Sequence, residues 1–477
     1  MKIAIVHYHL RRGGVTRVIE TALQGFREAG AEVECVVLSG EAPEETSPLF
    51  PHHRVVPGLG YANEFVANST LADDLRQSAV DALGAPPDVW HIHNHSLGKN
   101  VGMPLVLDRL LDSGAKLLLQ IHDFAEDGRP ENFRRQRVAV DPAETTWYPS
   151  AAQIHYALLN QRDAHFLGQA GLAADRLHLL PNAVAAPPVE SPTRPTFVKP
   201  GQRFLLYPTR GIRRKNLGEM LLLAAISGDD VAFASTLAPE NPEWLAIHDR
   251  WKALAATHGL PVELGIGSDP AVSFGGLMAA ADAILTTSVA EGFGLAFLEP
   301  WLAPKTIRGR DLPEITGDFA EKGIDLGGLY QRLDVPVDWI DAEAFRKKLN
   351  SALNASFQSY GRRLPDEAIE QAFHAAVTQD RVDFGRLDEE LQERVLEAAI
   401  RDRDAIETPT LSGASADEIN ANASAIADAY GIAAYGRRLA GIYGELCDAP
   451  LSETDSLDGE KLLDAFLDPS RFMLLRS

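Results

Sequence analysis

Two glutamates with seven residues between them, glycines included, are residues whose types and spacing could do chemistry. They lie in the stretch Glu291-Gly-Phe-Gly-Leu-Ala-Phe-Leu-Glu299. The apolar residues 282–288 before them predict a buried strand, and residues 295–303 predict a helix, with Glu299 about one turn inside it. In a parallel sheet such a turn lies where ligands bind, and its glycines let the backbone approach a phosphate. Glu291 and Glu299 could therefore accept hydrogen bonds from the hydroxyls of one ligand.

Four cationic residues within six positions form a second candidate site, in a chain whose formal net charge is -22. They stand between an expected strand at 203–207 and an expected helix at 217–226, and they are Arg210, Arg213, Arg214 and Lys215. Arginine and lysine side chains can neutralise phosphates without a metal ion. The alternative is a solvated helix start, although cations there oppose the helix dipole. Together with the acid pair, this stretch indicates a ligand with a diphosphate between two polyols, which is a nucleotide sugar.

The first 38 residues predict a Rossmann-like βαβ unit. Apolar strands are expected at 3–6 and 33–38, and between them a helix is expected at 16–29 after Gly13 and Gly14. This glycine pair is not the dinucleotide fingerprint. It can still bring backbone N–H groups to a phosphate, and a plain turn is the alternative.

Histidines gather at the ends of two further predicted strands. His91, His93 and His95 alternate along residues 89–95 and would share one strand face, a pattern that metal ligands can have. Because no carboxylate is placed to complete a metal site, we expect some of them to line an acceptor cleft instead. His122 follows the strand at 116–121, where ligands bind in parallel sheets, and a structural histidine is the alternative reading.

The polar loop after His122 is expected to recognise an acceptor. It begins with Asp123, continues through residues 125–133, and is followed by Arg134. Its mixed charges suit a small polar acceptor, including an acidic one held by arginine. Loops are also charged for solubility alone, so this stretch does not identify the acceptor.

These stretches resemble the family-4 retaining glycosyltransferases of GT-B fold. The hallmark of that family is a Glu, seven residues and a second Glu, which matches Glu291 and Glu299. The family also has an Arg followed about five residues later by a Lys, which matches Arg210 and Lys215. Residues 181–184 match its P-N-G-V segment, with Ala183 in place of glycine. The resemblance is specific over residues 1 to about 125 and about 178 to 316, and it fades over 318–410.

The resemblance implies a role for each motif. Glu291 would hold the hydroxyls of the transferred sugar and Glu299 the ribose. Arg210 and Lys215 would stabilise the leaving diphosphate, and His122 would contact the donor sugar or the acceptor. The implied catalytic residues are His122, Arg210, Lys215 and Glu291. No metal ion or other cofactor would be required, because the nucleotide sugar is a co-substrate.

The resemblance and the loop together predict two binding sets. The expected donor-binding residues are Gly13, Gly14, Arg210, Lys215, Gly265, Ile266, Glu291, Gly292, Phe293, Gly294, Leu295 and Glu299, with the nucleobase near Gly265 and Ile266. The expected acceptor-binding residues are His93, His95, His122, Asp123 and Arg134. The partners are thus a nucleotide-sugar donor and a small-molecule or glycan acceptor.

A proline-rich stretch divides the chain, which with 477 residues is too long for one core of usual size. Residues 187–200 contain five prolines and predict a linker. We therefore expect an α/β chain of GT-B fold, with two Rossmann-like domains facing across a cleft. The acceptor-side domain covers 1–190, the nucleotide-sugar domain 200–420 with a helical elaboration at about 318–410, and residues 421–477 a helix at 423–446 that crosses back, plus a tail.

Composition excludes several other classes. The negative charge argues against nucleic acid and against broad binding to anionic membranes. No run approaches the roughly 18 apolar residues that a membrane helix needs, and the four apolar residues at 3–6 are too few for a signal peptide, so we expect a cytoplasmic protein. A nucleotide-sugar epimerase and a non-catalytic nucleotide-sugar-binding protein remain alternatives. Oligomeric state is open, a dimer included.

Overall fold

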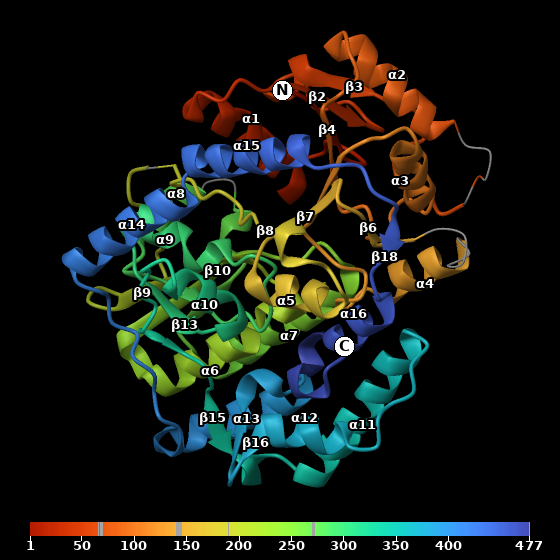
Figure 1. Ribbon diagram of the computed structural model, residues 1–477. Coiled ribbons are helices and arrows are strands. Elements are labelled where there is room, and N and C mark those ends of the chain that lie inside the picture. Colours follow the sequence, from red (N-terminus) through yellow and green to blue (C-terminus); the bar gives the residue numbers. More distant parts are fainter. Residues whose placement is uncertain (65, 67–69, 140–145, 189, 270–271, 477) are drawn as a thin grey trace. The chain divides into compact units, whose positions relative to one another are not determined.

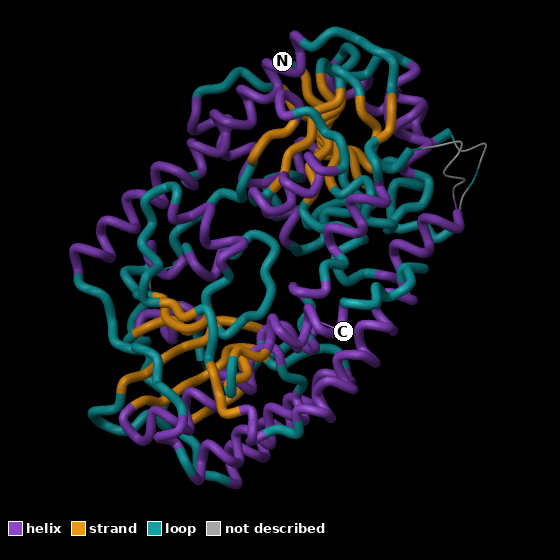
Figure 2. The backbone as a smooth tube through the Cα atoms, turned by 60° about the horizontal axis from the view of Figure 1, so that its bottom comes forward, coloured by secondary structure: helices purple, strands orange, loops and turns teal. Residues whose placement is uncertain are grey.

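Two compact units make up the computed structural model, which describes residues 1–64, 66, 70–139, 146–188, 190–269 and 272–476. Unit 1 comprises Met1–Ala183 and Asp428–Leu467, and unit 2 comprises Val184–Ala427 and Asp468–Ser477. The proline-rich stretch expected as a linker lies inside unit 2, and its Val189 falls outside the described residues. Each unit is built on its own parallel sheet with helices around it (Figures 1 and 2), which confirms the predicted α/β class with two Rossmann-like domains.

Unit 1 is built on a seven-stranded parallel sheet of order β3-β2-β1-β4-β5-β7-β8. Its strands are β1 (Lys2–Val6), β2 (Glu34–Ser39), β3 (His53–Val55), β4 (Val89–His93), β5 (Leu117–Ile121), β7 (Ile154–Leu158) and β8 (Leu177–Leu179). Its helices are α1 (Gly14–Ala29), α2 (Leu71–Leu83), α3 (Met103–Asp112), α4 (Pro130–Ala139), α5 (Gln161–Gln169), α15 (Ile432–Asp448) and α16 (Gly459–Phe466). The central strands are buried from end to end, as expected of parallel strands with helices on both faces.

Helix α15 completes the core of unit 1 by packing along α1 (Figure 1, blue beside red). The two backbones touch, because a Cβ atom on Gly436 would lie 2.1 Å from the carbonyl oxygen of Gly25. One helix predicted at 423–446 is in fact two, α14 (Ala416–Tyr430) and α15, since Gly431 is extended and breaks it. A short antiparallel pair, β6 (Pro149–Ser150) with β18 (Asp455–Ser456), ties in the segment that follows α15.

Unit 2 is built on a six-stranded parallel sheet of order β11-β10-β9-β12-β13-β14. Its strands are β9 (Arg203–Arg210), β10 (Val231–Leu237), β11 (Val262–Leu264), β12 (Ala283–Thr286), β13 (Ile307–Arg310) and β14 (Leu329–Tyr330). The helices that surround it are α6 (Leu217–Ser227), α7 (Pro242–Thr257), α8 (Phe274–Ala280), α9 (Glu299–Leu302) and α10 (Pro313–Ala320).

The elaboration expected to be helical is a mixed structure. Its helices include α11 (Ala342–Ser359), α12 (Ala368–Ala376) and α13 (Glu389–Arg401), in line with the predicted helical character. Among them lies an unpredicted antiparallel sheet of β15 (Asp334–Pro336), β17 (Arg381–Asp383) and β16 (Val377–Thr378), whose strands are too short to give an alternating pattern. Helix α13 packs on α6, so the elaboration is continuous with the core of unit 2.

Residues 468–476 pack against the rest of unit 2. The Arg386 guanidinium donates to the carbonyl oxygens of Ser470 at 2.8 Å and Phe472 at 3.2 Å, and Leu474 and Leu475 are buried. Within the described part of the chain, we find no helix that combines the length and the apolar character of a membrane span.

Candidate active site

Lys215 and Glu291 form the central ion pair of unit 2. They follow β9 and β12, which are parallel neighbours, so the loops after both strands emerge at the same edge of the sheet. The Lys215 ammonium contacts the Glu291 carboxylate, and Nη1 of Arg214 lies 3.3 Å from Oε2 of Glu291. The Lys215 and Glu291 side chains are only 14% and 10% exposed. A buried charge pair is thus present at the strand ends, where the sequence predicted an anion site and a sugar-binding acid.

Burial and mutual charge set the protonation of this pair. Burial alone would raise the pKa of the Glu291 carboxyl, but the charges of Lys215 and Arg214 outweigh it and hold that pKa below its usual value. Burial lowers the pKa of the Lys215 ammonium, an effect that Glu291 opposes and Arg214 reinforces. Glu291 therefore stays ionised at neutral pH and acts only as a hydrogen-bond acceptor.

Hydrogen bonds to the main chain hold Lys215 in place. The Tyr207 hydroxyl donates to the Lys215 carbonyl oxygen at 3.2 Å, and the Thr287 hydroxyl donates to the same oxygen at 3.0 Å. The backbone N–H of Val289 donates to the carbonyl oxygen of Arg214 at 2.9 Å. Because these partners come from β9 and from the loop after β12, the turn is fixed from two sides.

Asn216 continues this turn into a buried polar network. Its backbone is left-handed, with φ of 52°, and its side chain donates to Glu219 at 2.7 Å and accepts from Gln392 at 2.8 Å. Glu219 in turn accepts from Arg310 at 2.7 Å, and Arg310 also donates to Asp383 at 2.8 Å. The Glu219 side chain is 0% exposed and that of Arg310 is 2% exposed.

Sequence reasoning missed this network, although one signal was available. Arg308 and Arg310 lie in β13, a strand buried along its whole length, and a buried arginine needs acceptors such as carbonyl or carboxylate oxygens. The partners of Arg310 come from α6 and from β17, far apart in the sequence. The network therefore joins the elaboration to the turn that carries Lys215.

The four clustered cations do not act as one group. Nη1 of Arg210 lies 2.7 Å from Oε1 of Glu240 and 3.4 Å from the carbonyl oxygen of Ala238, so this side chain turns away from Glu291. Arg213 forks onto Glu389 at 2.7 and 2.9 Å. The expectation that Arg210 and Lys215 face the acid pair together is therefore corrected: Lys215 and Arg214 contact Glu291, whereas Arg210 pairs with Glu240. Sequence spacing cannot show how a turn distributes successive side chains.

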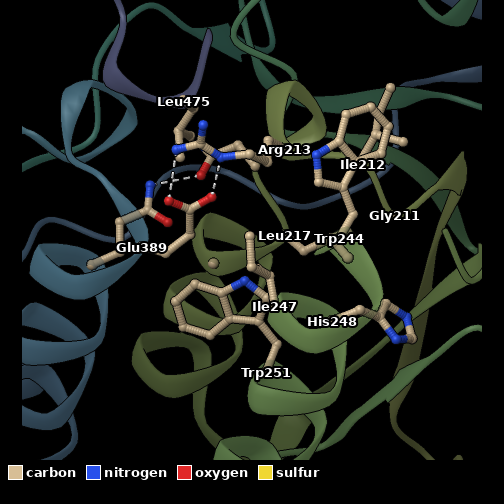
Figure 3. Close-up of a pocket in the computed structure, with 13 residues that line it drawn as sticks. Gly211, Ile212, Arg213, Leu217, Trp244, Ile247, His248, Trp251, Glu389 and Leu475 are labelled. Carbon is tan, nitrogen blue, oxygen red and sulfur yellow. Dashed lines mark hydrogen bonds and ion pairs between the residues drawn. The ribbon is translucent and has the colours of Figure 1, made fainter. Parts of the chain in front are cut away.

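A small pocket, with a cavity volume of about 20 Å³, lies beside the same turn (Figure 3). Arg213 and Glu389 close one end, and Trp244 and Trp251 contribute aromatic surface to its lining. The sequence analysis did not predict a role for His248. Its ring lies between two predicted donor-binding loops, those that contain Gly211 and Gly265. A Cβ atom on Gly211 would lie 3.0 Å from its ring, and one on Gly265 would lie 3.6 Å from it.

The loop between the two glutamates depends on one glycine. Gly294 has φ of 89°, and a Cβ atom there would lie 2.9 Å from the Phe297 ring. The buried Phe293 ring packs edge-on against Phe319 at 5.6 Å. Gly292 is exposed at the surface of the loop, while Leu295 and Glu299 are half-buried.

Glu299 is placed differently from the prediction. Residues 295–303 are not one helix, because a 3-10 turn over Leu295–Phe297 precedes the short helix α9, and Glu299 is the first residue of α9. The predicted nucleobase loop has Gly265 in a left-handed conformation with φ of 77° after β11, followed by Ile266 at the start of a 3-10 turn.

Unit 1 brings several predicted acceptor residues together. Nδ1 of His93, at the end of β4, lies 2.9 Å from Nε2 of His122, which follows β5, and the two rings stack. The side-chain oxygen of Asn94 accepts from the backbone N–H groups of His122 at 2.7 Å and Asp123 at 3.2 Å. Parallel neighbouring strands thus place His93 and His122 side by side.

The alternation predicted that His95 shares a strand face with His91 and His93. In the structure it does not. Asn94 is left-handed, with φ of 54°, which reverses the direction of the next side chain. His95 hydrogen-bonds through Nε2 to the Trp147 carbonyl oxygen at 2.9 Å, whereas His91 contacts the Tyr443 hydroxyl and the Gln120 side chain. His91 is thus a fully hydrogen-bonded core residue.

Burial keeps these histidines neutral. It lowers the pKa of His122 to about 4 and that of His91 to about 3, and it holds the pKa of His93 well below its usual value. No set of three or more His, Cys, Asp or Glu side chains among the described residues is arranged to hold a metal ion.

The remaining predicted residues of unit 1 are nearer the surface. Asp123 pairs with Arg129 at 2.5 Å, and the exposed Arg134 donates to the Pro130 carbonyl oxygen of its own helix, at 3.4 Å. Gly13 caps α1 and Gly14 begins it, and a Cβ atom on Gly14 would meet no heavy atom within 4 Å. The start of α1 is therefore open to a ligand.

Comparison with known proteins gives a family for part of the chain. Residues 13–183 match the glycosyl transferase 4-like domain. Mannosylglucosyl-3-phosphoglycerate synthase of Petrotoga mobilis is 24% identical to the chain over 418 residues, which cover 82% of this chain and 79% of the relative. These findings confirm the predicted resemblance to family-4 glycosyltransferases and support glycosyltransferase activity.

Solved structures of similar fold are more distant in sequence. Anabaena Alr3699/HepE, solved in complex with UDP, has a TM-score of 0.52 at 13% identity, over 93% of this chain and 100% of that one. Sucrose-phosphate synthase from Thermosynechococcus elongatus has a TM-score of 0.50 at 12% identity, over 93% of this chain and 98% of that one. At these identities the likeness concerns the fold alone, which is the GT-B fold of glycosyltransferases.

Proposed function

We propose that the protein transfers a sugar from a nucleotide-diphosphate sugar to a hydroxyl of a small polar acceptor, with retention of configuration and without a required metal ion. The buried Lys215–Glu291 pair carries this proposal, because it places a cation for the diphosphate beside an ionised acceptor for sugar hydroxyls. The complex of the Anabaena protein with UDP supports a nucleotide donor.

In the proposed reaction the acceptor oxygen bonds to the anomeric carbon on the face from which the diphosphate departs. The bond from that carbon to the diphosphate oxygen breaks through an oxocarbenium-like state, and the departing phosphate takes the acceptor proton. Lys215 and Arg214 neutralise the charge that develops on the leaving group. Glu291 orients the transferred sugar and Glu299 the ribose, while His122 and Gly14 serve the acceptor side.

Arg210 fits this scheme despite its present partner. Its ion pair with Glu240 is exposed, at 40% and 82% of the two side chains, and an exposed pair contributes only about 0–1 kcal/mol. Exchanging Glu240 for a phosphate would therefore cost little. Arg213 is different, because its two hydrogen bonds to the half-buried Glu389 give it a structural role.

Donor binding can be tested first, by thermal unfolding with a panel of UDP-, GDP- and ADP-sugars. A donor at one hundred times its dissociation constant stabilises the folded state by about 2.7 kcal/mol. The stabilising donor is then incubated with acceptors, and the products are followed by mass spectrometry and their anomeric configuration by NMR. Because the Petrotoga relative is named for a mannosylglucosyl-3-phosphoglycerate, the acceptors should include glycosylated glycerates.

Each alternative has its own result in this experiment. Conversion of the donor to an isomer without an acceptor would indicate an epimerase. Donor binding with no turnover across the panel would indicate a non-catalytic binding protein. An inverted product would overturn the proposed retention while leaving transfer intact.

A further inference from the structure

A second pocket, with a cavity volume of about 200 Å³, lies in unit 1. Its lining includes Glu126 from the loop after β5, Phe133 and Arg137 from α4, Trp147, and Gly459 and Glu460 from the start of α16. Small-molecule sites usually span about 300–1,000 Å³ and combine aromatic side chains with a few polar groups. The lining of this pocket fits that description, and its volume, below that range, limits the ligand to a small one.

Two aromatic rings form a corner of the pocket. The rings of Phe133 and Trp147 are 5.6 Å apart and nearly perpendicular, at 89°. The Arg137 guanidinium lies over the Phe133 ring at 5.6 Å, which leaves Trp147 as the aromatic surface for a ligand. The indole N–H of Trp147 is buried and has no acceptor among the described residues. Buried polar groups are nearly always paired, so this N–H is suited to a ligand oxygen.

Glu126 provides a hydrogen-bond acceptor, whereas the Trp147 N–H is a donor. It is only 2% exposed, and both its carboxyl oxygens accept from the Tyr148 hydroxyl at 3.0 Å. Burial raises the pKa of Glu126 to about 7. A carboxyl group in this environment can accept a hydrogen bond from a ligand hydroxyl when ionised and donate one when protonated.

The rim of the pocket carries no net charge. Nη1 of Arg137 lies 3.3 Å from Oε1 of Glu460, so the cation is already matched. The wall of the pocket also joins a predicted acceptor residue, because Nε2 of His95 hydrogen-bonds to the Trp147 carbonyl oxygen at 2.9 Å and its ring packs edge-on against Tyr148. These features suit an uncharged, hydroxyl-rich ligand.

We propose that this pocket binds a neutral pyranose ring of the acceptor, with Trp147 against the ring and with Glu126 and the Trp147 N–H bonded to its hydroxyl groups. The inference rests on the proposed transferase function, which requires an acceptor but does not locate it. It assigns acceptor recognition to this pocket rather than to Arg134, whose hydrogen bond lies within its own helix.

The variant Gly459→Leu tests the pocket by filling it. Gly459 lines the pocket at the first position of α16, and a Cβ atom there would meet no heavy atom within 4 Å, so the new side chain begins in open space. Gly441→Leu is the matched control, because Gly441 is an exposed residue of α15 with the same free space. Glu126→Gln, which keeps the shape of the side chain, tests the carboxyl group separately.

Binding of methyl glucoside would be followed by saturation-transfer NMR, and donor binding by thermal shift. We expect Gly459→Leu to weaken methyl glucoside binding and to raise the KM for the acceptor at least about tenfold, since each 1.4 kcal/mol is tenfold in affinity. Gly441→Leu should change methyl glucoside binding and the acceptor KM less than twofold. Both variants should keep the thermal shift that the donor induces.

Three results would overturn this inference. The first is a folded Gly459→Leu variant whose methyl glucoside binding and acceptor KM match those of the wild type. The second is binding of glucose 6-phosphate with none of methyl glucoside, and the third is an equal loss in the Gly441→Leu control. If methyl glucoside binds at the pocket but no nucleotide sugar is bound or used, the pocket stands and the proposed function fails.

Discussion

Asn94 in unit 1 and Asn216 in unit 2 have the same backbone conformation, but different kinds of hydrogen bond hold them in it. Both are left-handed, with φ of 54° and 52°, and each lies beside a proposed catalytic residue. Asn94 accepts from two backbone N–H groups, those of His122 and Asp123, and its carbonyl oxygen accepts from the Tyr8 hydroxyl at 2.8 Å. Asn216 instead bonds to Glu219, a member of a buried ion cluster.

The difference extends to the residues that each asparagine positions. Around Asn94 the side chains are histidines that burial keeps neutral, whereas Lys215 and Glu291 beyond Asn216 are ionised. A diphosphate needs fixed positive charge, whereas an acceptor hydroxyl needs hydrogen-bonding partners but no such charge. Each unit thus matches the electrostatic requirement of the substrate proposed for it.

Replacing the central arginine of the ion cluster should have the largest effect on stability. Arg310→Met leaves the carboxylates of Glu219 and Asp383 buried without their cation, which should lower the free energy of unfolding by about 3–5 kcal/mol. Chemical denaturation measures this loss. Arg363→Ala removes an ion pair in which both side chains are at least 90% exposed, so it should change stability little. A loss below about 1 kcal/mol in Arg310→Met would contradict the view that charge holds unit 2.

Removing the cation at the proposed leaving group should have the largest effect on rate. Lys215→Ala should lower kcat by about 10²- to 10³-fold, the usual effect of losing one group that stabilises developing charge. Lys199→Ala, at an exposed lysine of the same unit, is the control and should retain the wild-type rate. Steady-state kinetics with the best donor checks both. Unchanged turnover in Lys215→Ala would exclude the leaving-group role.

Exchanging each asparagine for glycine tests the comparison directly. Glycine keeps the left-handed backbone without strain but removes the side-chain hydrogen bonds, so each variant should lose about 1–3 kcal/mol of stability. We expect Asn94→Gly to raise the KM for the acceptor, and Asn216→Gly to lower kcat and raise the KM for the donor. If both variants alter the same kinetic parameter, the division of roles between the units is wrong.

Acid should destabilise unit 1 before unit 2. Burial lowers the pKa of His91 to about 3 and that of His95 to about 4, both below the value of 6.5 in an unfolded chain. Between those values the unfolded chain binds protons that the folded chain does not. Stability is therefore complete above about pH 6.5 and falls as the pH drops, by about 1.4 kcal/mol per pH unit for each such histidine.

Hydrogen exchange of peptides from each unit, corrected for the intrinsic pH dependence of exchange, measures this effect between pH 7 and pH 5.5. His91→Gln should reduce the slope for unit 1 by one histidine. The control is His165→Gln, at an exposed position, which should leave the slope unchanged. Equal slopes for the two units would remove the contrast between them.

Metal removal should have the smallest effect of all. Since the proposed neutralisation of the diphosphate relies on Lys215 and Arg214, dialysis against EDTA should leave transferase turnover within about twofold. Re-addition of Mg²⁺ or Mn²⁺ to the dialysed protein is the control. A large loss that either ion restores would show that a metal ion shares the work assigned to these side chains.

The sequence predicted the parts of the site that follow from strand ends. Glu291 and Lys215 lie together because β9 and β12 are parallel neighbours, and the same argument brings His93 beside His122. The sequence could not predict the direction of the Arg210 side chain, since the turn that follows β9 decides which carboxylate each cation meets. The reversed direction of the His95 side chain could not be predicted for a similar reason, because one left-handed asparagine, Asn94, breaks the alternation.

Long-range partners were the other limit. The cluster around Arg310 joins α6, β13 and β17, and no local pattern connects residues 219, 310 and 383. The pocket beside Trp147 likewise depends on residues 456–460, which come after the 184–427 segment in the chain. Short strands such as β16 and β17 give no periodic signal at all.

The close backbone contact between Gly25 and Gly436 has a consequence for biosynthesis. The apolar face of α1, with Val18, Ile19 and Phe26, is covered in part by residues of α15, which a ribosome adds only after the 184–427 segment. At about 5–20 residues per second, translation of that segment takes roughly 10–50 s, and the face of α1 stays uncovered during that time. Nascent chains of this protein should therefore be targets for holding chaperones throughout translation of the second unit.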